Sequence, residues 1–322
     1  MRVVRYDEYG SPEVLRLIDA ETPEPGPGQV LIRAERVGLN YIDAVMRRGA
    51  GGAWQTDLPG SLTGEVVGHV ERIGPGVAGV AVGDRVAALV AKDACADLVL
   101  AEADWLASVP ADLDGATATA LPMLAPLASG LLRLARLEPG ETVLVHAAAG
   151  AVGHLAVQLA KQRGARVIGT TGTATKADAI RRYGADVVAD SSTPEWTEQV
   201  RAAAAGGVDV VLDSLGGDAT TQSLGLMAPY GRAVVYGALQ GEQSTVTAMD
   251  LYGLKSISGF SFLGWRAARP EDVRAEVAAL TEQLRTGTLR LAVAAEIPLD
   301  EVVKAHELLE DRTRVGRVVL SA

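Results

Sequence analysis

The sequence predicts an α/β protein of two domains, one β-rich and one built on a doubly wound parallel sheet. Its 322 residues are about twice the ~150 residues of an average domain, and 48% of them are hydrophobic, which is enough apolar material for two cores. In residues 1–110, short apolar runs lie between Gly and Pro turns. After residue 110, apolar runs alternate with helical patterns.

Short apolar runs predict the strands of the first domain. They cover residues 30–37, 65–73, 85–90 and 96–100. Turn clusters rich in Gly and Pro occupy residues 24–28 and 74–76, and the glycines of 49–53 predict a further loop. Many short strands joined by such turns are typical of a compact barrel-like or sandwich domain.

The second part of the chain alternates strands with helices. Strands are expected at 141–146, 166–169, 187–189, 208–213, 232–236 and 256–262, and helices at 152–163, 175–183, 194–204 and 270–285. Continuous apolar strands separated by helices indicate a parallel sheet covered on both faces. The tail adds a strand, a helix near 300–309 and a last strand at 317–320, and it is able to return to the first domain.

Charge and cysteine content exclude several classes of protein. Thirty basic and 40 acidic residues give a net charge of −10, which lowers the expectation of nucleic-acid binding. A single cysteine, Cys95, forms no intramolecular disulfide and indicates a reducing compartment, so a cytoplasmic location is expected. No apolar run of ~18 residues predicts a membrane span, and no secretory signal is visible.

The strongest motif is a strand, a turn of small residues and a helix at 143–153, which reads VLVHAAAGAVG. Ala148, Gly150 and Gly153 fill the three small positions of the dinucleotide-binding fingerprint. Ala151 and Val152 lie at the start of the helix, where free N–H groups bind a pyrophosphate. The alternative is a turn that only allows tight packing.

The end of the next strand indicates which nicotinamide cofactor binds. An acidic residue there holds the ribose 2′-OH of NAD, but residues 169–176 read GTTGTATK and contain no acid. Thr171, Gly172 and Lys176 instead offer the donors and the positive charge that a 2′-phosphate requires, so NADPH is expected rather than NADH. The alternative is a Thr-rich helix cap with a solvated lysine.

Other chemistries find no support in the sequence. One cysteine is too few for a four-cysteine zinc site, and the four histidines lack metal-ligand spacing. His146 ends a buried strand and is interpreted as a packed core residue. The chain has no Gly-x-Ser-x-Gly elbow and no Gly-Lys-Ser/Thr phosphate loop, which excludes the common hydrolase and NTPase classes.

Together these segments resemble the zinc-independent quinone oxidoreductase (zeta-crystallin-like) branch of the medium-chain dehydrogenase/reductase superfamily. The resemblance extends over nearly the whole chain. It is carried by VGLNYID at 37–43, GPGV at 74–77, VGDRV at 82–86, HAAAGAVG at 146–153, DSLG at 213–216 and VGR at 315–317.

The resemblance implies a specific domain organisation. A GroES-like substrate and catalytic domain comprises residues 1–121 and 266–322, and a Rossmann NADPH-binding domain comprises residues 122–265. A homodimer is also implied, and the apolar face of the expected strand at 256–262 is suited to pairing with a second copy.

The resemblance further implies the site residues. Asn40 replaces a zinc-ligand cysteine and faces the nicotinamide, and Tyr41 is its neighbour; both are expected to be catalytic. Glu65 follows Gly64, which stands where zinc relatives have a histidine, so no metal is expected. The remaining cofactor contacts are Thr171, Gly172, Lys176, Ser191 (where a tyrosine is common), Ser214, Tyr236, Gly237 and Arg317.

The expected reaction is hydride transfer from NADPH to a quinone-like acceptor. Asn40 would orient the nicotinamide or donate to the acceptor oxygen, and Tyr41 would donate a proton or only pack. Asp43 is expected to be a structural hydrogen-bond acceptor. Two alternatives stay open: reduction of activated C=C bonds in an enone or enoyl thioester, with Tyr41 as the acid, and NADPH binding without catalysis.

Overall fold

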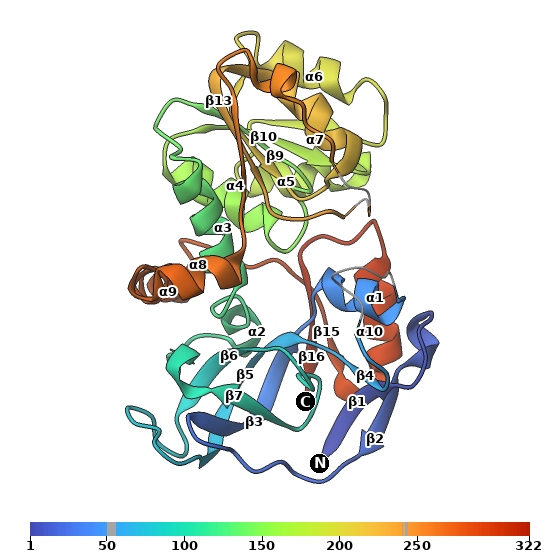
Figure 1. Cartoon of the computed structure of the whole chain (residues 1–322), viewed down its shortest axis with the longest axis vertical. Helices are drawn as coiled ribbons and strands as arrows, with labels where there is room; N and C mark the ends of the chain where they lie inside the picture. Colours follow the sequence, from blue (N-terminus) through green and yellow to red (C-terminus); the bar gives the residue numbers. More distant parts are fainter. Residues whose placement is uncertain (50–55, 240, 242–243) are drawn as a thin grey trace. The chain divides into compact units, whose positions relative to one another are not determined.

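The chain forms two compact units in the computed structural model, which describes residues 1–49, 56–239, 241 and 244–322 (Figure 1). Unit 1 comprises Met1–Met123 and Val277–Ala322, and unit 2 comprises Leu124–Glu276. Apart from Gly49, the loop predicted at 49–53 lies outside the described residues.

A seven-stranded sheet forms the framework of unit 1. Its order is β15-β16-β3-β5-β6-β8, with β7 paired to β3, and every pair is antiparallel except β15 with β16. The strands are β3 (Gln29–Gly38), β5 (Gly64–Ile73), β6 (Arg85–Val90), β7 (Leu98–Glu102), β8 (Ala107–Ser108), β15 (Val293–Pro298) and β16 (Arg317–Ser321). A second, three-stranded sheet consists of β2 (Arg16–Asp19), β1 (Arg2–Tyr6) and β4 (Gly60–Ser61).

The C-terminal tail is an integral part of unit 1. Strand β16 pairs with β3, and its Val318 and Leu320 are fully buried in one core with Val30 and Ile32 of β3. The helices of this unit are α1 (Tyr41–Arg47), α2 (Gly115–Ala118) and α10 (Val302–Glu310), and α9 (Pro270–Arg285) crosses the boundary between the units. The tail therefore does return to the first domain.

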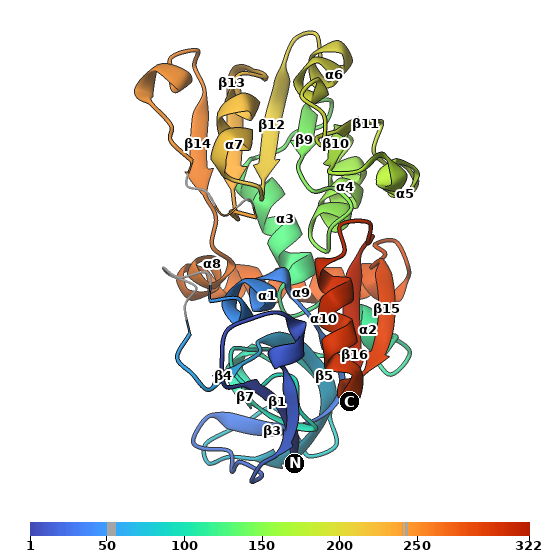
Figure 2. The same cartoon turned by 90° about the vertical axis from the view of Figure 1, so that its right-hand side faces the viewer.

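Unit 2 contains a six-stranded, wholly parallel sheet in the order β11-β10-β9-β12-β13-β14. The strands are β9 (Thr142–Val145), β10 (Arg166–Thr171), β11 (Val187–Asp190), β12 (Val208–Asp213), β13 (Met227–Val235) and β14 (Ser256–Gly259). The strand order reverses between β9 and β12, which is the switch point where such sheets bind ligands. Figure 2 shows β14 at the free edge of this sheet.

Helices connect the strands of unit 2. They are α3 (Leu124–Leu134), α4 (Gly153–Gln162), α5 (Ala177–Arg182), α6 (Trp196–Ala203), α7 (Gly217–Leu224) and α8 (Phe262–Ala268). The predicted α/β class with a β-rich domain and a doubly wound parallel sheet is confirmed. The strand expected at 256–262 was too long, because Ser261 accepts a hydrogen bond from the Gly264 amide (3.1 Å) and caps α8.

Candidate active site

The carboxyl ends of the parallel strands gather most of the predicted cofactor residues at one edge of the unit 2 sheet. The small-residue turn follows β9. Thr171 is the last residue of β10 and Gly172 follows it, and Ser191 follows β11. Ser214 follows β12, and Tyr236 and Gly237 follow β13. Residues separated by up to 90 positions therefore share the edge at which doubly wound sheets hold nucleotides.

The turn after β9 explains why small residues occupy it. A Cβ atom at Gly153 would collide with the Ala147 carbonyl oxygen and lie 2.8 Å from the Ala148 Cα atom, so only glycine fits there. A Cβ atom at Gly150 would lie 3.1 Å from the same oxygen, which a small shift relieves. Gly153 therefore serves the packing of α4, whereas the space at Gly150 does not by itself require glycine, and pyrophosphate access to its backbone stays a prediction.

Two buried histidines, His146 and His154, form hydrogen bonds at this turn, and neither contact was predicted from the sequence. Ser223 Oγ donates to the Ala219 carbonyl (2.7 Å), so its bond with His146 Nε2 (2.7 Å) requires a hydrogen on that nitrogen. His146 Nδ1 then accepts from Thr170 (3.0 Å), and burial lowers the pKa of His146, which keeps the ring neutral. This agrees with the interpretation of His146 as a core residue.

The second histidine, His154, acts on the turn directly. Because a carbonyl only accepts hydrogen bonds, His154 Nδ1 donates to the Gly150 carbonyl (2.7 Å) and fixes the plane of that peptide. Burial lowers the pKa of His154 to about 4, so the ring is neutral at physiological pH. The spacing of the glycine and the histidine, one helical turn apart, is the signal by which the sequence reveals such a contact.

The edge beyond β10 and β11 is rich in hydroxyl groups, but several of their hydrogens are already used. Thr171 donates to the Thr173 carbonyl (3.1 Å), and Ser191 donates to the Thr171 carbonyl (3.0 Å). Lys176 is half-buried in the short 3₁₀ turn Ala174–Lys176. Lys176 therefore contributes a positive charge at this edge, whereas the two hydroxyls are bonded to the backbone.

The ends of β12 and β13 contain a buried polar cluster. Asp213 accepts hydrogen bonds from the amides of Leu215 (2.7 Å) and Gly216 (3.2 Å) and from the Thr220 hydroxyl (2.5 Å). Burial raises the pKa of the neighbouring Tyr236 to about 12, so its hydroxyl stays protonated.

Ser214 and Gly237 lie beside this cluster, where the Ser214 side chain opposes the burial-driven rise in the pKa of Tyr236. Within the described part of the chain, the buried Ser214 Oγ has no hydrogen-bond partner. A Cβ atom at Gly237 would lie 2.9 Å from the Ser214 carbonyl oxygen, so the two segments approach as closely as glycine allows. An unpaired buried hydroxyl at the ligand edge of the sheet fits a polar cofactor such as NADPH.

In unit 1, Asn40 and Tyr41 lie at the start of α1. Asp43 holds this start in place through its fully buried carboxyl group. This group accepts hydrogen bonds from the backbone N–H of Thr63 (2.8 Å), from the Thr63 hydroxyl (2.9 Å) and from the backbone N–H of Asn40 (3.3 Å). Burial raises the pKa of Asp43 to about 6, while these hydrogen bonds oppose the shift. Asp43 therefore has the contacts of a structural acceptor.

Asn40 is joined to a buried ion pair. Its Nδ2 donates to Glu65 Oε2 (2.9 Å), and the same oxygen accepts from Arg317. Glu65 and Arg317 are fully buried in unit 1, and Arg317 also donates to the Thr119 carbonyl (2.9 Å). The structure thus connects Arg317 to Asn40 through Glu65. Glu65 and Arg317 are 252 positions apart, so no local pattern indicates this ion pair.

The second predicted catalytic residue, Tyr41, is half-buried and contacts an ionic cluster. Arg48 donates to the Tyr41 hydroxyl oxygen (3.4 Å) and forms an ion pair with Glu310 of α10 (2.5 Å). The fully buried Arg47 forms an ion pair with the same carboxylate. Because Arg48 occupies an acceptor site of the hydroxyl, the Tyr41 hydrogen is left to donate elsewhere.

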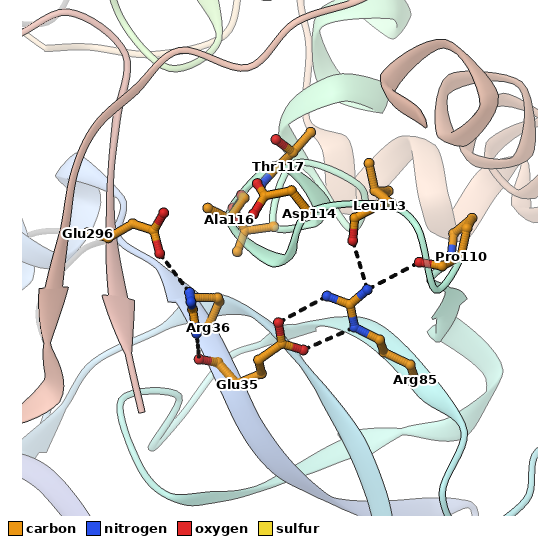
Figure 3. Close-up of polar contacts among 10 residues, drawn as sticks. Glu35, Arg36, Arg85, Pro110, Leu113, Asp114, Ala116, Thr117 and Glu296 are labelled. Atoms are coloured by element: carbon orange, nitrogen blue, oxygen red, sulfur yellow. Dashed lines mark hydrogen bonds and ion pairs between the residues drawn. The ribbon is translucent and has the colours of Figure 1, made fainter. Parts of the chain in front are cut away.

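A separate network holds the segment that leads to Thr119 (Figure 3). Arg85 of β6 donates to both oxygens of Glu35 on β3 (3.0 Å each) and to the carbonyls of Pro110 (3.1 Å) and Leu113 (2.7 Å). Asp114 then caps α2 through the Thr117 amide (2.8 Å). Helix α2, whose C-cap residue is Thr119, is thereby fixed against the sheet of unit 1.

The described residues do not fit a zinc ion. Outside the masked positions, no group of three or more His, Cys, Asp and Glu side chains is placed to bind a metal. Gly64 offers no ligand atom, and the Glu65 carboxylate is bound by the Arg317 guanidinium. Burial raises the pKa of the fully buried Cys95, which disfavours a thiolate.

Comparison with known proteins agrees with this architecture. The family described as zinc-binding dehydrogenase matches residues 151–282, and the alcohol dehydrogenase GroES-like domain matches residues 26–123. A quinone oxidoreductase from Pseudomonas aeruginosa is 35% identical over 98% of both chains, and a 2-haloacrylate reductase from a Burkholderia species is 33% identical over 97% of this chain and 96% of its own. The Escherichia coli quinone oxidoreductase, solved with NADPH, superposes with a TM-score of 0.92 at 30% identity over the whole of both chains.

The chain belongs to the quinone oxidoreductase branch of the medium-chain dehydrogenase/reductase superfamily. The resemblance inferred from the sequence is therefore confirmed, as is the GroES-like character of the first domain. Across the described residues, helices of the length and apolarity required to cross a membrane are absent.

Proposed function

We propose that this protein is an oxidoreductase that transfers a hydride from NADPH to a quinone-like, electron-poor acceptor without a metal ion. The observation that carries the proposal is the ligand edge of the unit 2 sheet, where a glycine turn, an unpaired buried hydroxyl and Lys176 meet without an acidic residue at the 2′ position. NADPH as cofactor agrees with the E. coli relative, which was solved with this molecule.

The proposed roles divide between the two units. Unit 2 binds the cofactor, with Ala148, Gly150, Ala151, Val152 and Gly153 at the pyrophosphate. Thr171, Gly172, Lys176 and Ser191 serve the 2′-phosphate, and Ser214, Tyr236 and Gly237 serve the remainder of the cofactor. Unit 1 supplies Asn40, Tyr41 and, through Glu65, Arg317 for the nicotinamide end and the acceptor.

When bound, NADPH supplies the hydride, and the protein holds donor and acceptor together and excludes water. A quinone that accepts one hydride and one proton becomes a hydroquinone, and the charge that develops on its oxygen is already delocalised over the ring. Such an acceptor needs little acid assistance. Asn40, which lies beside the Glu65 carboxylate, orients the nicotinamide or donates to the acceptor oxygen, and the Tyr41 hydroxyl is the available proton donor.

A second candidate function has its own support. The Burkholderia relative is named a 2-haloacrylate reductase, and a haloacrylate is an activated alkene. Reduction of such a bond needs a proton for the carbon next to the activating group as well as a hydride for the other carbon. Tyr41 is the proposed source of that proton, which is supported by the Arg48 contact at its hydroxyl oxygen, since this contact leaves the hydroxyl hydrogen to donate elsewhere.

One experiment separates these functions. Purified protein, with a chelator and no added metal, is mixed with NADPH and either a small naphthoquinone or a linear enone of matched size, and NADPH absorbance is followed. Rapid turnover with the quinone supports the proposal. Turnover with the enone alone assigns the protein to C=C reduction, and tight NADPH binding without oxidation of either acceptor assigns it to a binding role.

The proposal extends to assembly and location. Strand β14 ends the unit 2 sheet with mainly exposed residues, and Met249 and Tyr252 just before it are 73% and 81% exposed. A free edge beside apolar side chains supports a homodimer formed by pairing of β14 with its copy. Light scattering on wild type and on Gly259→Pro tests the dimer, because the Phe260 amide donates to Val235 of β13 and the amide one residue earlier therefore faces the free edge. The single reduced cysteine supports a cytoplasmic location.

A further inference from the structure

The proposed function places Asn40 at the nicotinamide end of the cofactor. The hydrogen bonds of Asn40 determine which end of its side-chain amide, the nitrogen or the oxygen, faces Glu65. A carboxylate only accepts hydrogen bonds and a guanidinium only donates them. Glu65 Oε2 accepts from Arg317 and from Asn40 Nδ2 (2.9 Å), so the nitrogen of the Asn40 amide must face Glu65. The Asn40 side-chain oxygen therefore points away from the ion pair, toward the Asp43 backbone amide with which it forms the capping box of α1, and a second lone pair of this oxygen remains for a further donor.

We infer that Glu65 and Arg317 are positioning residues that fix the Asn40 amide, so that Asn40 Oδ1 accepts a hydrogen bond from the carboxamide NH₂ of the nicotinamide. The inference rests on the proposed function and decides between the two roles open to Asn40, since it makes this side chain a holder of the cofactor rather than a donor to the acceptor oxygen.

The burial of the two charges supports a positioning role over a stabilising one. Glu65 and Arg317 are both 0% exposed, and among the described residues Glu65 Oε1 and Arg317 Nε have no hydrogen-bond partner. An ion pair that is incompletely satisfied in the interior adds little to stability compared with an apolar pair of the same volume. What the pair does provide is a permanent acceptor at a fixed point beside Asn40.

The surroundings leave the ion pair no alternative arrangement. Arg317 is held by the Thr119 carbonyl (2.9 Å), and a Cβ atom at Gly38 would collide with its guanidinium, so the backbone of β3 packs directly on the group. Thr119 belongs to the end of α2, which the network of Figure 3 fixes to the sheet. The acceptor that orients Asn40 is thus anchored through three elements of unit 1.

The test compares two double variants that both remove the ion pair and differ only at the acceptor. Glu65→Gln/Arg317→Met keeps an oxygen beside Asn40, because a glutamine has the shape of glutamate and retains one side-chain oxygen that accepts from Asn40 Nδ2. Glu65→Met/Arg317→Met removes the oxygen. Any contact between Arg317 and the cofactor is lost equally from both. The dissociation constants of NADPH and of 2′-phospho-ADP-ribose, which lacks nicotinamide, are measured for each.

We expect Glu65→Met/Arg317→Met to bind NADPH about three- to tenfold more weakly than Glu65→Gln/Arg317→Met, which is the loss of one hydrogen bond, and to bind 2′-phospho-ADP-ribose equally. Adding Asn40→Ala weakens NADPH binding in the glutamine background and leaves it unaltered in the methionine background, because the amide is already unoriented there. Equal NADPH affinities of the two double variants overturn the inference.

Asn40→Asp extends the test to a partly exposed position that tolerates aspartate as a helix cap. Two carboxylates then face each other beside Asp43, whose pKa is about 6, so NADPH binding weakens at pH 8 and recovers in part as the pH falls and this acidic cluster takes up a proton. Asn40→Ala lacks this recovery. A pH-independent Asn40→Asp also overturns the inference, whereas a wild type that binds NADPH no better than 2′-phospho-ADP-ribose contradicts the proposed function itself.

Discussion

Replacing the buried His306 is expected to remove a measurable part of the sensitivity of this protein to mild acid, beside the parts that the buried His146 and His154 contribute. His306 lies on α10, is 0% exposed, and within the described part of the chain neither ring nitrogen has a hydrogen-bond partner. Burial, together with the positive charge of Arg47, lowers its pKa from 6.5 to about 3. The unfolded chain therefore binds a proton at this site well before the folded protein does.

The sign and the size of the effect follow from this difference. A histidine whose folded pKa is depressed favours unfolding as the pH falls below 6.5, and the loss continues until about pH 3. Between pH 8 and pH 5 the unfolded state gains about 2 kcal/mol from this one proton, and about 5 kcal/mol by pH 3. Because α10 packs on α1, which starts at Asn40 and Tyr41, acid is expected to loosen the candidate site as well.

The assay is urea unfolding followed by circular dichroism at pH 8 and pH 5 for wild type, His306→Leu and His69→Leu. The fall in unfolding free energy between the two pH values should be about 2 kcal/mol smaller in His306→Leu than in wild type. His69→Leu should retain the wild-type fall, because that ring is exposed in the folded protein. If His306→Leu loses as much stability as wild type, His306 is not the origin of the acid sensitivity.

Three further predictions concern the site. Lys176→Ala should raise the KM for NADPH about tenfold and that for NADH little, since one charge-assisted contact to a 2′-phosphate is lost; equal effects on both cofactors would refute the assignment. Gly153→Ala should cost about 1–3 kcal/mol in urea unfolding because its Cβ meets the Ala147 carbonyl, whereas Gly150→Ala should fold normally and bind NADPH more weakly in a fluorescence titration. Tyr41→Phe should leave naphthoquinone reduction within about threefold of wild type and reduce enone reduction at least ~100-fold if Tyr41 is the proton donor.

The sequence was informative where function depends on the ends of parallel strands. The strands of unit 2 are continuous apolar runs, so their ends, and hence the positions of Gly150, Lys176 and Ser214, follow from the pattern and from the topology of such sheets. The turn at Gly153 was likewise predictable, since its requirement for a small residue is local.

Local patterns failed where an element is short, irregular or polar. Strands β1, β2, β4 and β8 were missed: β2, β4 and β8 are short or have few buried residues, whereas β1 has buried residues and was simply not recognised at the start of the chain. Helix α3 was missed because Pro126 lies within it, although proline is tolerated in a first turn, and α7 because it begins with glycine and is rich in hydroxyl residues. In the two helices tertiary packing outweighs the local preference.

The same distinction separates the residues that bind from the residues that position. Asn40 was predicted as a site residue, but its link to Arg317 runs through Glu65. The Glu65–Arg317 pair spans 252 positions and depends on β16 pairing with β3, which no local pattern contains. A pair of apolar residues would fill the space of this ion pair without loss of stability. Stability therefore gives no reason for two charges at this point in the core. The orientation of the Asn40 amide does, because only an acceptor that is itself held in place determines which end of that amide faces the cofactor.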